Sequence, residues 1–293
     1  MIKLKKIKLV NFCGFRDFEL DLTEKEGVRQ WTVLFGTNGS GKSSVLNAIR
    51  LLSSPWQMEN RPDLTLFLRR LTYHPDYLSN YLGYIDHRND MYAEATFLIE
   101  EEEKKVIIKN TGKKETTGLI KNELPKDIFS FSFYVDADNP INTQNFQIIQ
   151  DYREQFLDFA KEVYGFDCIF PDERITTEEY DTQKNEYIRY ITDFILVKDD
   201  GTKVHYKRFS DGEKKIAKIL TTLFNNVYDK KEQSYILLID SIEKEIYFKR
   251  HMKLINKLTE HFPNNQFFIA THSPIIINEM EKKCLIDLEK RNS

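Results

Sequence analysis

Hydrophobic and polar side chains alternate along residues 4–22 in two runs that meet at Gly14. This pattern is typical of two half-buried strands joined in a hairpin. The apolar run at 30–35 is followed by a glycine-rich turn and then by apolar side chains at helical spacing, which predicts a strand, a loop and a helix in that order. Residues 92–118 predict strands joined by charged turns, and residues 127–137 predict another strand.

The second half of the chain has a more regular pattern. Residues 146–163 show the periodicity of an amphipathic helix, and residues 186–209 predict a hairpin that turns at Asp199 to Thr202. Helices and strands then alternate, and the expected elements are a helix at 211–228, a strand at 234–240, a helix at 248–261, a strand at 266–271 and a helix at 275–281. This alternation predicts an α/β fold with a largely parallel sheet flanked by helices.

The composition narrows the class of protein. With 293 residues, of which 41% are hydrophobic, the chain can bury a sizeable core. The net charge of -3 gives no general attraction to nucleic acid or to an anionic membrane. The cysteines Cys13, Cys168 and Cys284 form no CxxC pair, which argues against a disulfide framework and a thiolate zinc site. No apolar stretch approaches 18 residues, so we expect a cytoplasmic protein without a membrane partner.

The segment GTNGSGKS at residues 36–43 satisfies the pattern G-x-x-x-x-G-K-[ST] and stands between a predicted strand and a predicted helix. Its glycines let backbone N–H groups approach phosphate oxygens, and the helix N-terminus adds a positive dipole end. We expect Lys42 to reach the β- and γ-phosphates of a nucleotide and the Ser43 hydroxyl to bind Mg²⁺, although the loop alone could belong to a kinase, a GTPase or an ATPase. The residues expected to contact the nucleotide here are Gly36, Asn38, Gly39, Ser40, Gly41, Lys42, Ser43 and Ser44.

Three later motifs complete a nucleotide site. In FSDGE, Ser210 and Gly212 stand at the start of a predicted helix, where they can form a second anion site, although Ser-Asp-Gly is also an ordinary helix cap. Asp240 ends the apolar strand SYILLID, where a carboxylate can hold Mg²⁺. Thr271 and His272 end another apolar strand, where a side chain can sense a γ-phosphate.

Together these motifs resemble those of ABC-type AAA ATPases. Residues 36–43 look like a Walker A loop, FSDGE like the ABC signature, ILLID like Walker B, and THSP like the switch-histidine loop. The N-terminal IKLVNFCGF is similar to the start of RecF-like and SMC-like ATPases. In style these segments are similar to the compact AAA/ABC-hybrid group that includes the ATPase half of OLD-family proteins and many bacterial phage-defence ATPases. The resemblance covers about 1–50 and 200–288 well.

The resemblance implies a fold and a domain organisation. Residues 1–293 are expected to form a single ABC-type ATPase domain with a mixed or parallel sheet core flanked by helices and an N-terminal antiparallel β subdomain. Its N-terminal lobe would span 1–52 and its C-terminal lobe 186–293. Residues 53–185 would form an inserted β and helical subdomain.

The resemblance also implies a homodimer with composite ATP sites. Ser210 and Gly212 of one subunit would contact the γ-phosphate held by the Walker A loop of the other. His272 would act in catalysis. The implied Mg²⁺ ligands are Ser43, Asp240 and a glutamine that senses whether Mg²⁺ is bound. Gln144 or Gln147 could be this glutamine.

Ser241 departs from the family pattern, because a glutamate normally follows the Walker B aspartate and polarises the attacking water. A serine hydroxyl has no basicity near neutral pH and cannot act as the general base. Three explanations stay open: a naturally slow site that uses ATP as a binding switch, which we favour; an engineered substitution that traps the dimer; or a base from another side chain. Glu243 is nearby, but the family commonly carries an acidic residue there as well as the catalytic one.

Ile246, Tyr247 and Phe248 replace a Leu-His-Pro turn, so the dimer-contacting loop also departs from the pattern.

Three classes of function follow from these residues. The first is a dimeric ATP switch or scaffold for an effector or toxin partner, with anti-phage defence as the process considered. The tyrosine-rich residues 73–84 would then be either a partner surface or part of the packing of the inserted subdomain. The second is a DNA-processing ATPase of the OLD or RecF kind, but without SMC-like arms, because no heptad repeat separates the two halves. The third is a metal-dependent nuclease using Asp136 and Asp138, or the DHRND segment at 86–90. The N-terminus argues against a transporter cassette.

Overall fold

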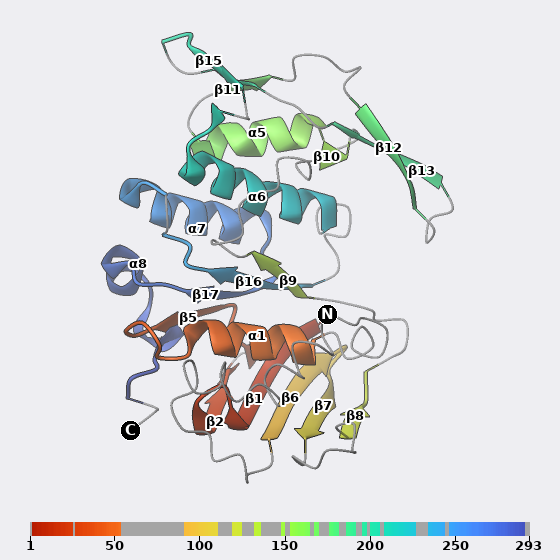
Figure 1. The fold of residues 1–293 in the computed structure, drawn as a ribbon, viewed down its shortest axis with the longest axis vertical. Helices are drawn as coiled ribbons and strands as arrows, with labels where there is room; N and C mark the ends of the chain where they lie inside the picture. Colours follow the sequence, from red (N-terminus) through yellow and green to blue (C-terminus); the bar gives the residue numbers. More distant parts are fainter. Residues whose placement is uncertain are drawn as a thin grey trace, which may run out of the picture. The chain divides into compact units, whose positions relative to one another are not determined.

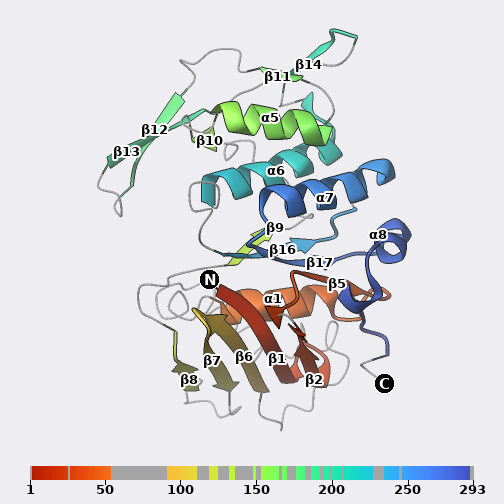
Figure 2. The ribbon, with the colours of Figure 1, turned by 180° about the vertical axis from the view of Figure 1, so that it is seen from behind.

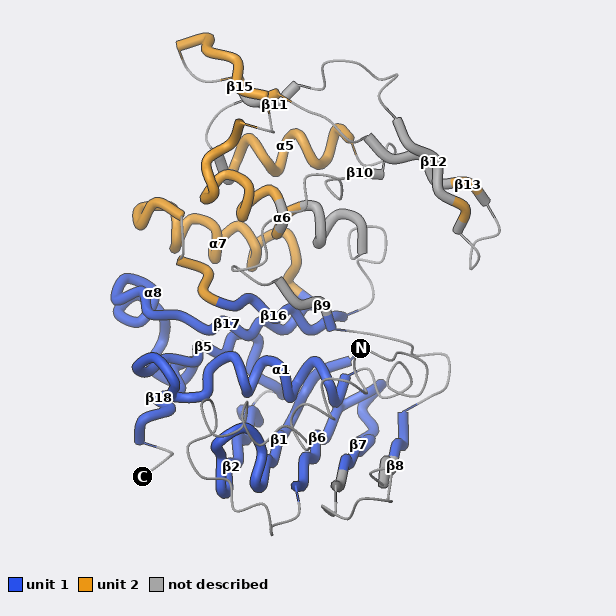
Figure 3. Tube along the Cα trace, viewed as in Figure 1, with its two compact units in different colours: residues 1–134, 232–240, 264–293 blue, residues 135–231, 241–263 orange. Residues whose placement is uncertain are grey.

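The structure is a computed structural model, and its contacts divide the chain into two compact units (Figure 3). The first unit comprises residues 1–134, 232–240 and 264–293, and the second comprises 135–231 and 241–263. The residues that the structure describes are 2–25, 27–53, 91–110, 119–124, 132–135, 148–149, 153–164, 167–169, 176–181, 186–191, 195–197, 200–205, 208–226, 234–243 and 246–290.

The first unit contains a five-stranded antiparallel sheet in the order β2-β1-β6-β7-β8. Its strands are β1 (Ile2–Phe12), β2 (Phe15–Asp21), β6 (Met91–Ile99), β7 (Glu102–Asn110) and β8 (Leu119–Asn122). The predicted hairpin around Gly14 is confirmed, and this glycine has a φ of +91°, which suits the tight turn. Leu9 opposes Ala93 in the register of β1 and β6, so the sheet joins the N-terminal hairpin to strands from residue 91 onward.

The second sheet of this unit has the order β18-β5-β17-β16-β9. Its strands are β9 (Ser132–Val135), β16 (Ile236–Asp240), β5 (Trp31–Phe35), β17 (Gln266–Ala270) and β18 (Leu285–Asp287). The pairs β16–β17, β17–β5 and β5–β18 are parallel. Strands β5, β16 and β17 are almost entirely buried. The predicted apolar strands are thus confirmed, and their parallel pairing explains why they read as continuous hydrophobic runs.

Helix α1 (Lys42–Leu52) lies between these two sheets (Figure 1). It contacts β6 and β7 on one side and β16 and β17 on the other. Val45, Leu46, Ile49 and Leu52 are fully buried, because a helix covered on two faces must be apolar on both. The phosphate loop therefore leads into the central helix of the unit.

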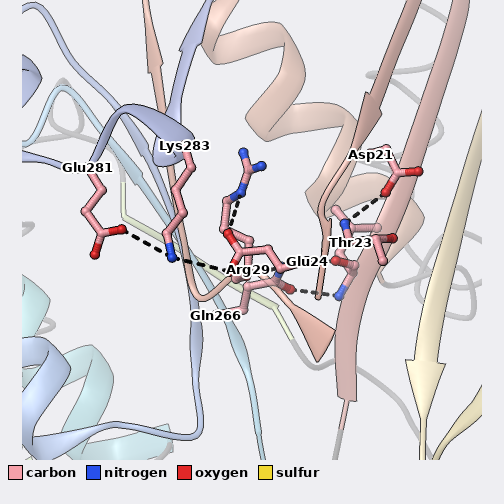
Figure 4. A network of polar contacts seen from close by, with 8 residues as sticks. Asp21, Thr23, Glu24, Arg29, Gln266, Glu281 and Lys283 are labelled. Atoms are coloured by element: carbon pink, nitrogen blue, oxygen red, sulfur yellow. Dashed lines mark hydrogen bonds and ion pairs between the residues drawn. The ribbon is translucent and has the colours of Figure 1, made fainter. Parts of the chain in front are cut away.

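The side chain of Gln266 links the N-terminal strand β1 to the parallel sheet through hydrogen bonds (Figure 4). Its Oε1 accepts a hydrogen bond from the Leu4 N–H at 2.7 Å, and its Nε2 donates to the carbonyls of Leu4 and Arg29, each at 3.0 Å. Nearby, Lys283 forms ion pairs with Glu24 at 3.5 Å and with Glu281 on its own segment at 3.2 Å. A buried amide satisfied at both ends fixes how the two strands meet.

The smaller elements of the first unit complete its framework. They are β3 (Thr23–Glu24), β4 (Gly27–Val28), α8 (Pro274–Glu279) and a 3₁₀ turn at Lys282–Cys284. Helix α8 begins where the Ser273 hydroxyl accepts a hydrogen bond from the Ile276 N–H, with Pro274 in its first turn. No helix in the described ranges is long and apolar enough to span a bilayer.

Within its described residues, the second unit contains three helices, which are labelled in Figures 1 and 2. They are α5 (Arg153–Tyr164), α6 (Asp211–Asn226) and α7 (His251–His261), the last preceded by a 3₁₀ turn at Phe248–Arg250. Two three-stranded sheets accompany them, formed by β10 (Ile148–Ile149), β13 (Glu186–Ile191) and β12 (Thr176–Asp181), and by β11 (Asp167–Ile169), β14 (Ile195–Val197) and β15 (Lys203–His205). Helix α5 packs on α6 and α7, with Phe159 buried against Phe262.

Two predictions for this unit are wrong in part. The helix predicted at 146–163 begins only at Arg153, because Ile148 and Ile149 pair with β13 and β-branched residues favour strands. The hairpin predicted at 186–209 is limited to β14 and β15, which turn at the expected place. Strand β13 pairs instead with β12, where Tyr180 and Tyr187 oppose each other with ring centroids 5.0 Å apart.

Candidate nucleotide-binding site

The phosphate loop connects β5 to α1 through three glycines with positive φ angles. Gly36, Gly39 and Gly41 have φ values of +145°, +83° and +97°, a region that side-chain-bearing residues rarely adopt. A Cβ on Gly41 would lie 2.4 Å from the Cζ of Phe15, and a Cβ on Gly36 would lie 2.8 Å from Ser40 Oγ. The loop is therefore a compact backbone cradle that additional side chains would fill, as binding of a phosphate requires.

Lys42 is buried, and its ammonium lies within the loop. Its Nζ donates to the carbonyls of Gly36 at 3.0 Å and Thr37 at 2.9 Å. Ser43 is exposed in the first turn of α1, and Ser44 is half-buried beside it. This turn contains no acidic residue, so the positive end of the helix dipole meets no carboxylate of its own helix.

Strands β16 and β17 run parallel to β5 and end at the same edge of the sheet as this loop. Asp240 ends β16 and is buried, and His272 follows β17 and is exposed. The Thr271 hydroxyl between β17 and α8 accepts a hydrogen bond from the Ser273 N–H at 3.0 Å, which fixes the turn that carries His272. A hollow of about 280 Å³ beside the loop is lined by Phe35, Gly36, Thr37, Thr271, His272, Ile277, Asp287 and Glu289. His272 and the start of the loop therefore border one cavity.

Ser241, the first residue after Asp240, has a φ of +48°, in the left-handed region. Its carbonyl accepts a hydrogen bond from Nζ of Lys215, a buried lysine in the second turn of α6. The side chain of Ser241 is half-buried, and so is that of Glu243. The structure thus places a hydroxyl, not a carboxylate, directly after the strand that carries Asp240.

Ser210 and Gly212 begin α6 in the second unit. The backbone N–H and the hydroxyl of Ser210 donate to Glu213 Oε2 at 2.8 and 2.9 Å, and the Glu213 N–H donates back to Ser210 Oγ at 3.3 Å. This reciprocal arrangement is a capping box. Ser210 is exposed and Gly212 is buried. The hydroxyl that would contact a partner's phosphate is therefore the N-cap of its own helix.

Several predicted residues lie outside the described part of the chain. They are Gln144, Gln147, Asp136, Asp138, the tyrosine-rich residues 73–84 and the DHRND segment at 86–90. Within the described ranges, no group of three or more His, Cys, Asp or Glu side chains could hold a metal ion.

The family model for the AAA ATPase domain matches residues 2–163. The chain belongs to the AAA ATPase domain family. A search of curated proteins finds the Septu protein PtuA of Bacillus mycoides (strain KBAB4), which is 23% identical over 316 residues covering 99% of this chain. The chain spans 41% of the length of that relative.

Solved structures with the same fold include head domains of SMC proteins. The SMC head domain from Thermotoga maritima has a TM-score of 0.55 at 17% identity, covering 94% of this chain and 91% of that one. The SMC head bound to the C-winged helix domain of ScpA has a TM-score of 0.57 at 13% identity, covering 98% of each chain. The Pyrococcus furiosus head bound to the C-terminal domain of ScpA also has a TM-score of 0.57, at 10% identity, covering 99% of this chain and 98% of that one. The chain thus shares the fold of these SMC head domains.

Sequence reasoning missed three side-chain contacts made with residues that it had selected as candidates. Phe15 packs on Gly41, Lys215 contacts the Ser241 carbonyl, and Glu289 accepts a hydrogen bond from the Thr37 N–H. Each lies far in sequence from the group that it touches, and only Phe15 belongs to one of the motifs described above, as the last residue of IKLVNFCGF. Only the tertiary fold brings them to the site.

Cys13 sits beside the start of α1 in the turn between β1 and β2. Burial raises the pKa of its thiol to about 12, although a hydrogen bond with Ser44 acts in the opposite direction. The thiolate is the reactive form, and it is scarce until the pH approaches this pKa. At pH 8 we expect iodoacetamide to label Cys13 about a hundredfold or more slowly in the folded chain than in urea, as measured by mass spectrometry. Equal rates would contradict a protonated thiol.

Proposed function

We propose that this AAA ATPase domain binds ATP with Mg²⁺ at residues 36–44 and acts mainly as a nucleotide-dependent binding switch. The observation that carries the proposal is the loop itself, in which Lys42 lies inside a cradle of glycines with positive φ angles. A lysine in this cradle is placed to exchange the Gly36 and Thr37 carbonyls for phosphate oxygens. The N-terminus of α1 would contribute its amides to the same phosphates.

The other residues of the first unit would complete the magnesium site. We assign the Ser43 hydroxyl and the Asp240 carboxylate as protein ligands, with phosphate oxygens and water supplying the remainder. Gln144 stays a proposed additional ligand. When bound, Mg²⁺ would neutralise charge that develops on the phosphate oxygens. His272 borders the cavity next to the start of the loop, a position suited to contact with the terminal phosphate.

Hydrolysis at this site is proposed to be slow. Ser241 can donate a hydrogen bond to the attacking water but cannot remove its proton near neutral pH. Binding depends on Lys42 and the loop amides, which do not involve Ser241. Holding ATP and cleaving ATP are therefore separable in this chain.

We further propose a homodimer in which Ser210 and Gly212 contact nucleotide held by the partner's loop. This part of the proposal comes from the ABC-type resemblance. The exposed rings of Tyr247 and Phe248, with centroids 4.7 Å apart, follow Ser241 closely and supply an aromatic surface of the kind enriched at interfaces. We keep the domain boundaries as a proposal, with lobes at 1–52 and 186–293 and an insertion at 53–185.

An effector or toxin partner and a role in anti-phage defence are also proposed. Similarity to the Septu protein PtuA and the resemblance to phage-defence ATPases support this reading. Two of the SMC heads with the same fold were solved with a bound domain of another protein, ScpA, which supports the idea that this fold docks a partner protein. Because the chain spans 41% of the PtuA relative, the activity of the whole relative is not transferred to it.

The test is Mg-ATP binding with and without Lys42. Replacing Lys42 with alanine removes a charged donor to the phosphates, so we expect the Kd for Mg-ATP to rise about 10- to 100-fold in isothermal titration calorimetry. Light scattering should show the wild-type mass doubling with Mg-ATP and the variant remaining a monomer. Lys253→Ala, which removes an exposed lysine of α7, is the matched control. A wild-type chain that binds no Mg-ATP would refute the proposal.

A further inference from the structure

The carboxylate of Glu289, two residues after the end of β18, lies against the start of the phosphate loop. Glu289 Oε1 accepts a hydrogen bond from the Thr37 N–H at 2.7 Å, although 252 positions separate the two residues. The fold explains the contact, since β18 pairs in parallel with β5 and Asp287 opposes Phe35. The Leu288 N–H continues this ladder by donating to the Phe35 carbonyl at 3.0 Å. The chain after β18, which carries Glu289, therefore runs beside the start of the phosphate loop after β5.

The peptide groups around Thr37 are held from two sides. The Thr37 carbonyl accepts from Lys42 Nζ at 2.9 Å, whereas its N–H donates to Glu289. The backbone of Glu289 is itself fixed, because its N–H donates to Asp287 Oδ1 at 3.1 Å. A Cβ on Gly36 would lie 3.5 Å from the Cγ of Glu289, so the carboxylate stem packs directly on the loop. These contacts hold the loop start in one conformation.

Binding of a nucleotide would change only one of these two restraints. Lys42 would turn from the loop carbonyls to the phosphates, whereas the Glu289 carboxylate carries the same sign of charge as the phosphates and would keep its hydrogen bond with the Thr37 N–H. We infer that Glu289 is a positioning residue for nucleotide binding, which keeps the Thr37 amide and the loop start in place when Lys42 moves to the phosphates. This inference rests on the proposed function of the loop and adds a residue to it.

The opposite role would follow if the Glu289 carboxylate competed with phosphate for a loop amide. Removing a competitor would tighten nucleotide binding, whereas removing a positioning residue weakens it, because the loop must then be ordered during binding. The sign of the change in Kd therefore separates the two roles. Both Glu289 and Thr37 are exposed, so solvent weakens the hydrogen bond and the expected change is modest.

The experiment compares Glu289→Ala, Glu289→Gln and Glu281→Ala by calorimetric titration with Mg-ATP and with Mg-ADP. Glu289→Ala should raise the Kd about three- to tenfold for both nucleotides, because the loop holds phosphates in each case. Glu289→Gln keeps a neutral acceptor for the Thr37 N–H and should recover part of the loss. Glu281→Ala removes an exposed glutamate that pairs with Lys283 in the same C-terminal segment, and its Kd should equal that of the wild type.

Thermal melting supplies the second readout. Glu289→Ala should melt within about 2 °C of Glu281→Ala, because one exposed hydrogen bond adds little to the stability of the fold. An unchanged or lower Kd in Glu289→Ala, or a loss of binding that only follows a large drop in melting temperature, would overturn the inference while leaving nucleotide binding by the wild type intact. A wild-type chain without affinity for Mg-ATP would instead refute the proposed function on which the inference rests.

Discussion

Replacing Ser241 with glutamate is expected to raise the rate of ATP hydrolysis about 100- to 1,000-fold, because a positioned carboxylate supplies the general base that the serine hydroxyl cannot. Ser241 directly follows Asp240, the proposed metal ligand at the end of β16. Its backbone has a φ of +48°, so the glutamate enters a strained position that the serine already occupies. Steady-state phosphate release with saturating Mg-ATP measures the gain.

Two control variants locate the base. Ser241→Gln has nearly the same size as the glutamate but no basicity, so its rate should stay at the wild-type level. Glu243→Gln should also leave the slow wild-type rate unchanged. Appreciable wild-type turnover that survives Ser241→Ala and disappears in Glu243→Gln would show that the base lies at Glu243 and that the Ser241 assignment is wrong.

Replacing Gly41 with alanine is expected to abolish measurable Mg-ATP binding and to lower the free energy of unfolding by about 2–4 kcal/mol. The new Cβ would lie 2.4 Å from the Cζ of Phe15, a ring that is 2% exposed and cannot move into solvent. The φ of +97° adds backbone strain for any residue with a side chain. Urea unfolding and calorimetric titration measure the two effects.

Gly39 supplies the matched control for this prediction. It also has a positive φ, of +83°, but a Cβ there would meet nothing within 4 Å. Gly39→Ala should therefore cost only the strain, about 1 kcal/mol of unfolding free energy. Equal losses at the two glycines would show that contact with Phe15 is not the cause. Phe15→Leu combined with Gly41→Ala should destabilise less than the sum of the two single changes, because the smaller side chain relieves the overlap.

Local sequence patterns predicted most of the first unit because its elements carry their own signals. The buried strands Trp31–Phe35, Ile236–Asp240 and Gln266–Ala270 are continuous apolar runs, and the glycine motif between strand and helix marks the phosphate loop. The predicted positions of Asp240 and His272 at strand ends follow from the same runs. A parallel sheet then brings these ends to one edge without further information.

Features that depend on a distant partner could not be predicted in this way. Strand β12 reads TTEEYD, which has no apolar period, and it exists because β13 pairs with it. Ile148 and Ile149 continued a helical periodicity, but pairing with β13 decided their conformation. The left-handed φ of Ser241 and the contact of Glu289 with Thr37 are properties of the folded backbone that no residue type encodes.

The position of α1 between two sheets has a thermodynamic consequence. A ligand held at the N-terminus of this helix is attached to an element that contacts both β6 and β17. Any free energy gained from binding to the folded state alone is added to the free energy of unfolding, by about 2.7 kcal/mol when the free ligand is at 100 times its Kd. Both sheets would share this gain, so the resistance of the first unit to unfolding and proteolysis would follow the nucleotide level of its surroundings.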